Sequence, residues 1–99
     1  MESLEELRKS IDNIDNAIVA MFAERFKVTT KVGHYKAKHG LPAKDIQREA
    51  VQFNRIVELA NHYGLDPEFA RELLSKVIDR VVQNHELIAQ EYLSKNLKN

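Results

Sequence analysis

The chain has 99 residues, enough for one small domain, and its 43% hydrophobic and 30% charged residues exclude a disordered or membrane-embedded protein. Fifteen basic residues balance fifteen acidic ones, so the net charge gives no support to a nucleic-acid partner. Cysteine is absent, which excludes disulfides, thiolate nucleophiles and cysteine metal sites. No apolar run approaches the ~18 residues of a membrane span, and the acidic start lacks a signal-peptide core. We therefore expect a cytoplasmic protein without membrane contact.

A long helix is predicted over residues 4–38, because apolar residues recur there at spacings of three and four. Ser3 is its candidate N-cap, Gly40 caps its end and Pro42 prevents continuation. Gly33, inside the pattern, either bends the helix or lets another group approach closely. At about 50 Å the helix is too long to be covered by one small domain, so we expect a symmetric homodimer. The apolar seam of this helix comprises Leu4, Leu7, Ile11, Ile14, Ile18, Met21, Val28, Val32 and Tyr35.

Two further helices are predicted, over residues 46–63 and 67–93. Asp45 is the expected N-cap of the earlier one, which ends at Gly64. Asp66, followed by proline, is a strong start signal for the last helix, and the residues after 93 are expected to fray. Because no strand-like alternation occurs, the sequence predicts a single all-α domain over residues 1–99, built from three helices.

Each predicted helix carries a polar residue where its pattern calls for an apolar one: Arg25, Glu49 and His85. Taken singly, each has a plain structural explanation, such as an arginine stem lying along the apolar face or a histidine satisfied within the core. Together they favour a polar pocket, because buried charges are costly unless they are paired. Lys36, about three turns after Arg25, and Arg48 would give this pocket surplus positive charge. Its natural ligand is a small organic anion, since guanidinium groups bind carboxylates in bidentate fashion.

Other site chemistries have less support. The four histidines lack metal-binding spacing, so we expect no metal site. The sequence contains no glycine-rich phosphate loop and no recognisable serine nucleophile turn. Asp45 and Glu49 share a helix face, as an acid pair would, but Asp45 has the competing role of N-cap.

Four motifs follow one another along the chain: Leu-Glu-Glu-Leu-Arg8-Lys-Ser-Ile-Asp-Asn-Ile-Asp15, Ala-Glu-Arg25, Lys31-Val-Gly-His-Tyr-Lys36 and Leu41-Pro-Ala-Lys-Asp45-Ile-Gln-Arg48-Glu49. Each motif is weak alone, while the ordered set is specific. With these motifs the chain resembles the all-helical chorismate mutases over nearly its whole length. The resemblance implies an intertwined helical homodimer with two active sites, each completed by the first helix of the other chain. It also implies the Claisen rearrangement of chorismate to prephenate, in phenylalanine and tyrosine biosynthesis, with no cofactor.

The resemblance also implies roles for individual residues. Arg25 and the partner's Arg8 would hold the two carboxylates of chorismate, with Arg48 in support. Geometry agrees independently, because seventeen residues separate Arg8 from Arg25, about 25 Å along one helix and too far to grip the same ligand. Lys36 would donate to the ether oxygen and to a carboxylate. In the second helix, Glu49 would accept from the ring hydroxyl, with Asp45 close by.

Two positions depart from the family pattern. His85 stands where a glutamine usually gives the second donor to the ether oxygen, and Val81 where a serine is common. As that donor, His85 would act either as a neutral tautomer or as the imidazolium, in which case kcat would rise as the pH falls. The scaffold also supports isochorismate pyruvate lyase and aminodeoxychorismate mutase activities. A non-catalytic helical dimerisation or regulatory module, with the same charges in interchain salt bridges, is the alternative from another class.

Overall fold

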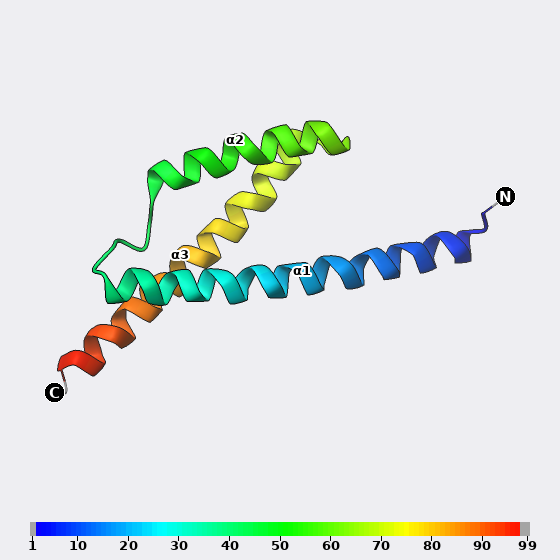
Figure 1. The fold of residues 1–99 in the computed structure, drawn as a ribbon. Coiled ribbons are helices and arrows are strands. Elements are labelled where there is room, and N and C mark those ends of the chain that lie inside the picture. The colour runs from blue at the N-terminus through cyan, green and yellow to red at the C-terminus, as the bar shows by residue number, and fades with distance from the viewer. Residues whose placement is uncertain (1, 98–99) are drawn as a thin grey trace.

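In the computed structural model, which describes residues 2–97, the chain forms three helices: α1 (Leu4–Lys38), α2 (Ile46–Tyr63) and α3 (Pro67–Leu97) (Figure 1). The described residues contain no strand, so the predicted all-α class is confirmed. The last helix was expected to end near residue 93 but continues to Leu97. The four added residues include neither glycine nor proline, so nothing in the backbone stops the helix earlier. None of the described helices is both long and apolar enough to cross a membrane.

Capping groups set the ends of α1. Ser3 Oγ accepts a hydrogen bond from the backbone N–H of Glu6 at 3.1 Å, as expected for its N-cap. At the other end, Gly40 adopts a φ of 64°, a conformation that favours glycine. The N–H of Leu41 then donates to the carbonyl oxygen of Lys36 at 2.8 Å. This turn redirects the chain just after the last turn of α1, so the next loop runs back past Lys36.

The same capping chemistry bounds the other two helices. Asp45 is the N-cap of α2, and Gly64 ends that helix with a φ of 75°. The side chain of Asp66 accepts from the backbone N–H of Glu68 at 3.0 Å and starts α3. These N-cap expectations are confirmed, and the resulting loops are short.

The third helix holds the fold together. It packs against both α1 and α2, whereas α1 and α2, within residues 2–97, do not pack directly on each other (Figure 1). The chain is elongated, measuring 67 × 26 × 15 Å, and its radius of gyration of 17.9 Å exceeds the ~13 Å of a compact chain of this length. The core is correspondingly small. Its buried hydrophobic side chains, among the described residues, are Ala60, Ala70, Leu74 and Ile78.

The N-terminal half of α1 extends beyond the other helices (Figure 1). Every residue from 2 to 21 is exposed. The apolar seam is open along its whole length, as Ile11 at 55% and Ile14 at 59% illustrate. The accessible surface of 8285 Å² exceeds by about 2,500 Å² the roughly 5,800 Å² expected for a compact protein of 11.4 kDa. So large an excess of accessible surface, together with an exposed apolar seam, is typical of a chain that packs against another polypeptide.

Candidate active site

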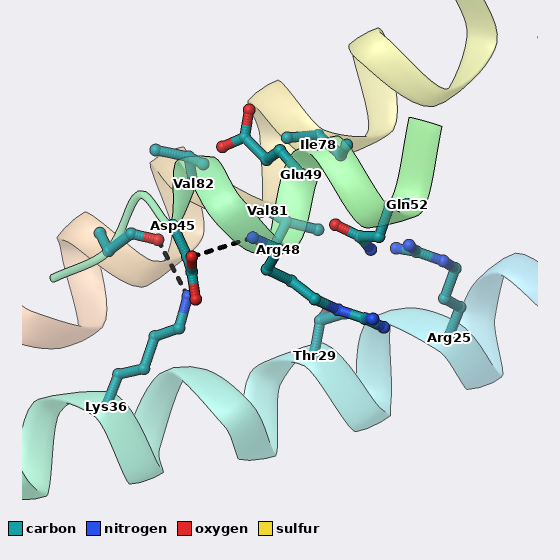
Figure 2. A pocket seen from close by; sticks show the side chains of 11 residues that line it. Arg25, Thr29, Lys36, Asp45, Arg48, Glu49, Gln52, Ile78, Val81 and Val82 are labelled. Atoms are coloured by element: carbon teal, nitrogen blue, oxygen red, sulfur yellow. Dashed lines mark hydrogen bonds between the residues drawn. The ribbon is translucent and has the colours of Figure 1, made fainter. Parts of the chain in front are cut away.

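A cavity lies between α1 and α2, beside the middle of α3 (Figure 2). It encloses about 370 Å³, including the solvent at its mouth. Side chains from all three helices reach it. Because α3 packs against both α1 and α2, these two helices stay apart and leave room for a small ligand. Of the eight residues predicted for the site, two do not line this cavity, Arg8 and His85. Those that line it are Arg25, Lys36, Asp45, Arg48, Glu49 and Val81.

Two arginines approach the same end of the cavity. Arg25 extends from α1 and Arg48 from α2, and their guanidinium groups converge (Figure 2). Nη1 of Arg25 is shielded from solvent and has no hydrogen-bond partner within residues 2–97. A buried charged donor without an acceptor is costly. The cavity therefore offers unused donor capacity to an anion, as the sequence pattern at Arg25 predicts.

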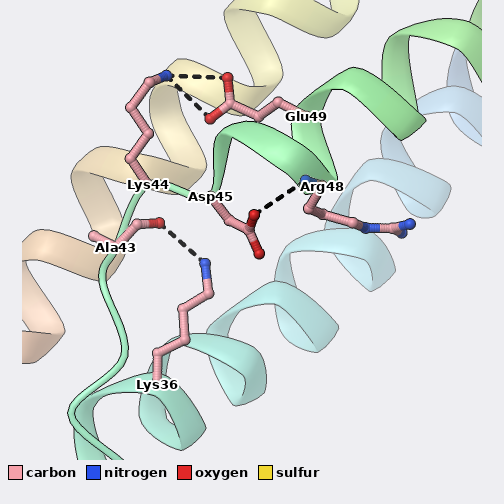
Figure 3. Close-up of polar contacts among 6 residues, drawn as sticks. All are labelled: Lys36, Ala43, Lys44, Asp45, Arg48 and Glu49. Carbon is pink, nitrogen blue, oxygen red and sulfur yellow. Dashed lines mark hydrogen bonds and ion pairs between the residues drawn. The ribbon is translucent and has the colours of Figure 1, made fainter.

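Lys36 lies at the opposite end of the cavity from Arg25 (Figure 2). Its Nζ donates to the carbonyl oxygen of Ala43 at 3.0 Å (Figure 3). It also contacts Nδ1 of His85 at 3.3 Å. Ala43 follows Lys36 by seven residues. Its carbonyl oxygen lies within reach of Lys36 because the turn after α1 brings the loop back. The ammonium group is thus held at two points and retains a third N–H.

The two acidic residues of the cavity have partners of their own (Figure 3). Oδ1 of Asp45 accepts from the backbone N–H of Arg48 at 3.0 Å, which is the N-cap interaction. Lys44 Nζ donates to both carboxylate oxygens of Glu49 at 3.0 Å. The Glu49 carboxylate points away from both cavity arginines in Figure 2. The ion pairs of the described residues include none between these acids and the cavity arginines, so the positive charge stays available.

His85 contacts Lys36 but is not one of the residues that line the cavity. It is 3% exposed, and its Nε2 lies 2.8 Å from the backbone carbonyl oxygen of Thr29. This placement differs from the expected one, in which the ring faces the ligand, because both ring nitrogens already have partners in the chain. Gly33 makes the placement possible, since a Cβ there would lie 2.7 Å from Cδ2 of His85. Of the two interpretations of this glycine, close approach of another group is confirmed.

The remaining predicted residues differ in position. Val81 lines the cavity from α3 and is half-buried, where it forms part of an apolar wall with Val82. Arg8 is exposed near the start of α1 and lies beside a separate surface hollow. By the helical rise, Arg8 stands about 25 Å along α1 from Arg25. It therefore does not reach the cavity of its own chain.

Two neutral polar residues in the cavity were not singled out from the sequence. Thr29 and Gln52 both line it, and the amide of Gln52 lies beside the Arg25 guanidinium in Figure 2. Helical spacing could have identified them. Thr29 follows Arg25 by four residues, and Gln52 follows Glu49 by three, so each shares a face with a predicted site residue.

The cavity has two arginines at one end and a lysine at the other, and no acid of the described residues is paired with either arginine. This arrangement suits a small dicarboxylate. Comparison with known proteins is consistent with this, because the profile of the family described as chorismate mutase type II matches residues 7–86. The chain belongs to this family. The resemblance inferred from the four sequence motifs is thereby confirmed.

Similar proteins within the chorismate mutases differ in their overall length. The chorismate mutase of Methanocaldococcus jannaschii is 30% identical over 93 residues, which cover 94% of this chain and 90% of that protein. The bifunctional chorismate mutase/prephenate dehydratase of Escherichia coli strain K12 is 29% identical over 89 residues, 90% of this chain but 23% of that protein. The bifunctional protein of the same name from Aquifex aeolicus is 42% identical over 82 residues and is likewise covered to 23%. The chain thus spans nearly all of the archaeal relative and about a quarter of the bifunctional ones.

Proposed function

We propose that the chain is a chorismate mutase, an intramolecular isomerase that converts chorismate to prephenate in phenylalanine and tyrosine biosynthesis. The observation that carries this proposal is the buried Nη1 of Arg25, which has no acceptor among the described residues. Arg48 lies beside it and Lys36 at the opposite end of the cavity. Chorismate carries two carboxylates, and a guanidinium binds a carboxylate with two parallel hydrogen bonds. Membership of the chorismate mutase family supports the same reaction.

The rearrangement breaks the ether C–O bond and forms a C–C bond within one molecule, so it needs neither a nucleophile nor a cofactor. The cavity would hold the compact conformer in which the two reacting carbons approach. As the C–O bond lengthens, negative charge gathers on the ether oxygen. The third N–H of Lys36 is suited to donate to that oxygen, and a donor fixed in advance stabilises the developing charge most effectively. Arg25 and Arg48 would hold a carboxylate, while Val81 contributes apolar wall.

Glu49 is proposed to accept from the ring hydroxyl of the substrate, with Asp45 close by at the N-terminus of α2. In the free chain the Glu49 carboxylate pairs with Lys44, whose side chain is 56% exposed. The Glu49 side chain itself is only 17% exposed, so its carboxylate needs a donor. A substrate hydroxyl would supply that donor in place of Lys44, whose ammonium group would return to water.

We further propose that the active unit is an intertwined homodimer. The excess surface of about 2,500 Å² per chain corresponds to roughly 5,000 Å² for two chains, in the range of obligate homodimers. A second copy running antiparallel along the apolar seam would cover α1 residues such as Ile11 and Ile14. The same arrangement would carry the partner's Arg8 toward the Arg25 end of the cavity. Because a two-fold axis relates the two chains, the same would hold at both sites.

The direct test adds purified protein to chorismate and follows the loss of chorismate absorbance together with the formation of prephenate. Arg25→Ala should lower kcat/KM by about 30-fold or more, since loss of a buried charged contact costs roughly 2 kcal/mol or more. Arg55→Ala, an exposed arginine of α2 outside the cavity lining, is the matched control and should keep wild-type activity. Thermal unfolding should show Arg25→Ala to be folded.

The alternatives predict different results. Pyruvate released from isochorismate would favour the lyase, and turnover of aminodeoxychorismate alone would favour that mutase. A dimer that neither accelerates the reaction nor gains melting temperature from chorismate would be a non-catalytic dimerisation module, and the enzyme proposal would then be wrong.

A further inference from the structure

The hydrogen bonds of His85 define which ring nitrogen carries the proton. The Thr29 carbonyl oxygen can only accept, so Nε2 of His85, 2.8 Å away, is the protonated nitrogen. The ammonium of Lys36 can only donate, so Nδ1, 3.3 Å from Nζ, is the nitrogen with the free lone pair. Both contacts are satisfied together by one state of the ring, the neutral tautomer with its proton on Nε2.

The same contacts restrict the ammonium of Lys36. One N–H donates to Ala43 at 3.0 Å and a second to His85, which leaves the third for the cavity that Lys36 lines. A lysine side chain has a flexible stem of four carbons, so its ammonium group is mobile unless other groups hold it. Two fixed acceptors on different elements, the loop before α2 and helix α3, hold its position before a ligand arrives.

We propose that His85 is a positioning residue, which accepts a hydrogen bond from Lys36 and aims the remaining N–H of that lysine into the cavity. His85 acts through Lys36 and does not touch the ligand. Its tautomer is set by Thr29, and the glycine at position 33 gives the ring room to reach both partners. The effect on rate rests on the proposed function, whereas the tautomer and its contact with Lys36 do not.

This role requires a free lone pair on Nδ1. A proton on Nδ1 would place an N–H against the ammonium of Lys36, 3.3 Å away, and would break the contact.

Nitrogen-15 NMR of the histidine rings in the intact protein tests the geometry without substrate. We expect His85 to show a protonated Nε2 and an unprotonated Nδ1 at neutral pH. Lys36→Met should shift the Nδ1 resonance, while the exposed His62 stays unchanged. A proton on Nδ1, or no response to Lys36→Met, would overturn the proposal whether or not the chain turns over chorismate.

Kinetics of two variants test the consequence for catalysis. His85→Leu keeps bulk but removes the acceptor, and we expect kcat to fall about 10-fold or more with a smaller change in KM. His85→Asn places an amide oxygen near the position of Nδ1 and should restore most of kcat. His62→Leu is the control and should be silent. Equal losses in the Leu and Asn variants, with both folded by circular dichroism, would contradict the proposal, as would wild-type kcat in His85→Leu.

Discussion

Gly33→Ala is a sensitive test of how closely the His85 ring packs against α1. In most helix interiors this change stabilises a protein by about 1 kcal/mol. Here the added Cβ would lie 2.7 Å from Cδ2 of His85 and 2.8 Å from Cδ1 of Ile88, whereas carbon atoms prefer separations of about 3.5–4.0 Å. The terminal methyl of Ile88 can rotate away. The ring of His85 cannot move so freely, because both of its nitrogens are hydrogen-bonded.

We therefore expect the contact to outweigh the helix propensity. Overpacking costs about 1–3 kcal/mol, which leaves a net destabilisation of up to about 2 kcal/mol. A ring displaced by about 0.8 Å to restore normal carbon separation would also lose its contact with Lys36, already at 3.3 Å. Gly33→Ala should thus lower kcat as well as stability. Urea unfolding measures the stability, at a fixed chain concentration because concentration matters for a dimer, and chorismate turnover measures kcat.

A second background isolates the cause. With His85→Ala already present the ring is gone, so Gly33→Ala should become neutral or stabilising by up to about 1 kcal/mol. The two changes should therefore be non-additive by roughly 1 kcal/mol or more. If Gly33→Ala stabilises the otherwise unaltered protein and leaves kcat intact, the close packing of His85 against α1 is refuted.

Two further predictions concern the dimer and the cap of α2. Ile14→Asp should yield an inactive monomer in light scattering, because a charge would enter the proposed interface. Asn16→Asp, on the opposite helix face, should stay dimeric. A dimeric, active Ile14→Asp protein would argue against the seam as the interface. Asp45→Ala should cost about 1 kcal/mol of stability and also lower activity, whereas Asp66→Ala, which removes the equivalent cap of α3 far from the cavity, should cost similar stability with kcat unchanged. Equal kinetic effects from both would show that Asp45 acts only through the fold.

The features that depend on local sequence could be predicted. Ser3 and Asp66 cap helices because a short oxygen-bearing side chain precedes an apolar pattern, and that chemistry involves only neighbouring residues. The inward cation at Arg25 was likewise visible as a break in the helical spacing. The end of α3 was not predictable in the same way, because Ser94 to Leu97 carry neither a stop signal nor a strong periodic pattern.

The features that depend on distant residues could not be predicted. Spacing assigns His85 to the interior, and it is buried, but its two partners lie 49 and 56 residues away along the chain. Only the packing of α3 on α1 determines that the ring meets Thr29 and Lys36. Glu49 gives a similar case, because its partner Lys44 belongs to the loop before α2 and the path of that loop is not encoded in helical spacing.

The central claim, an active site shared between two chains, is tested most directly by mixing Arg8→Ala and Arg25→Ala proteins, each expected to be inactive alone. After joint unfolding and refolding, a heterodimer contains one site with both arginines and one site with neither. Random pairing makes half of the dimers heterodimers, so we predict recovery of about one quarter of wild-type chorismate turnover. No recovery in a sample shown by mass spectrometry to contain the heterodimer would contradict the shared site.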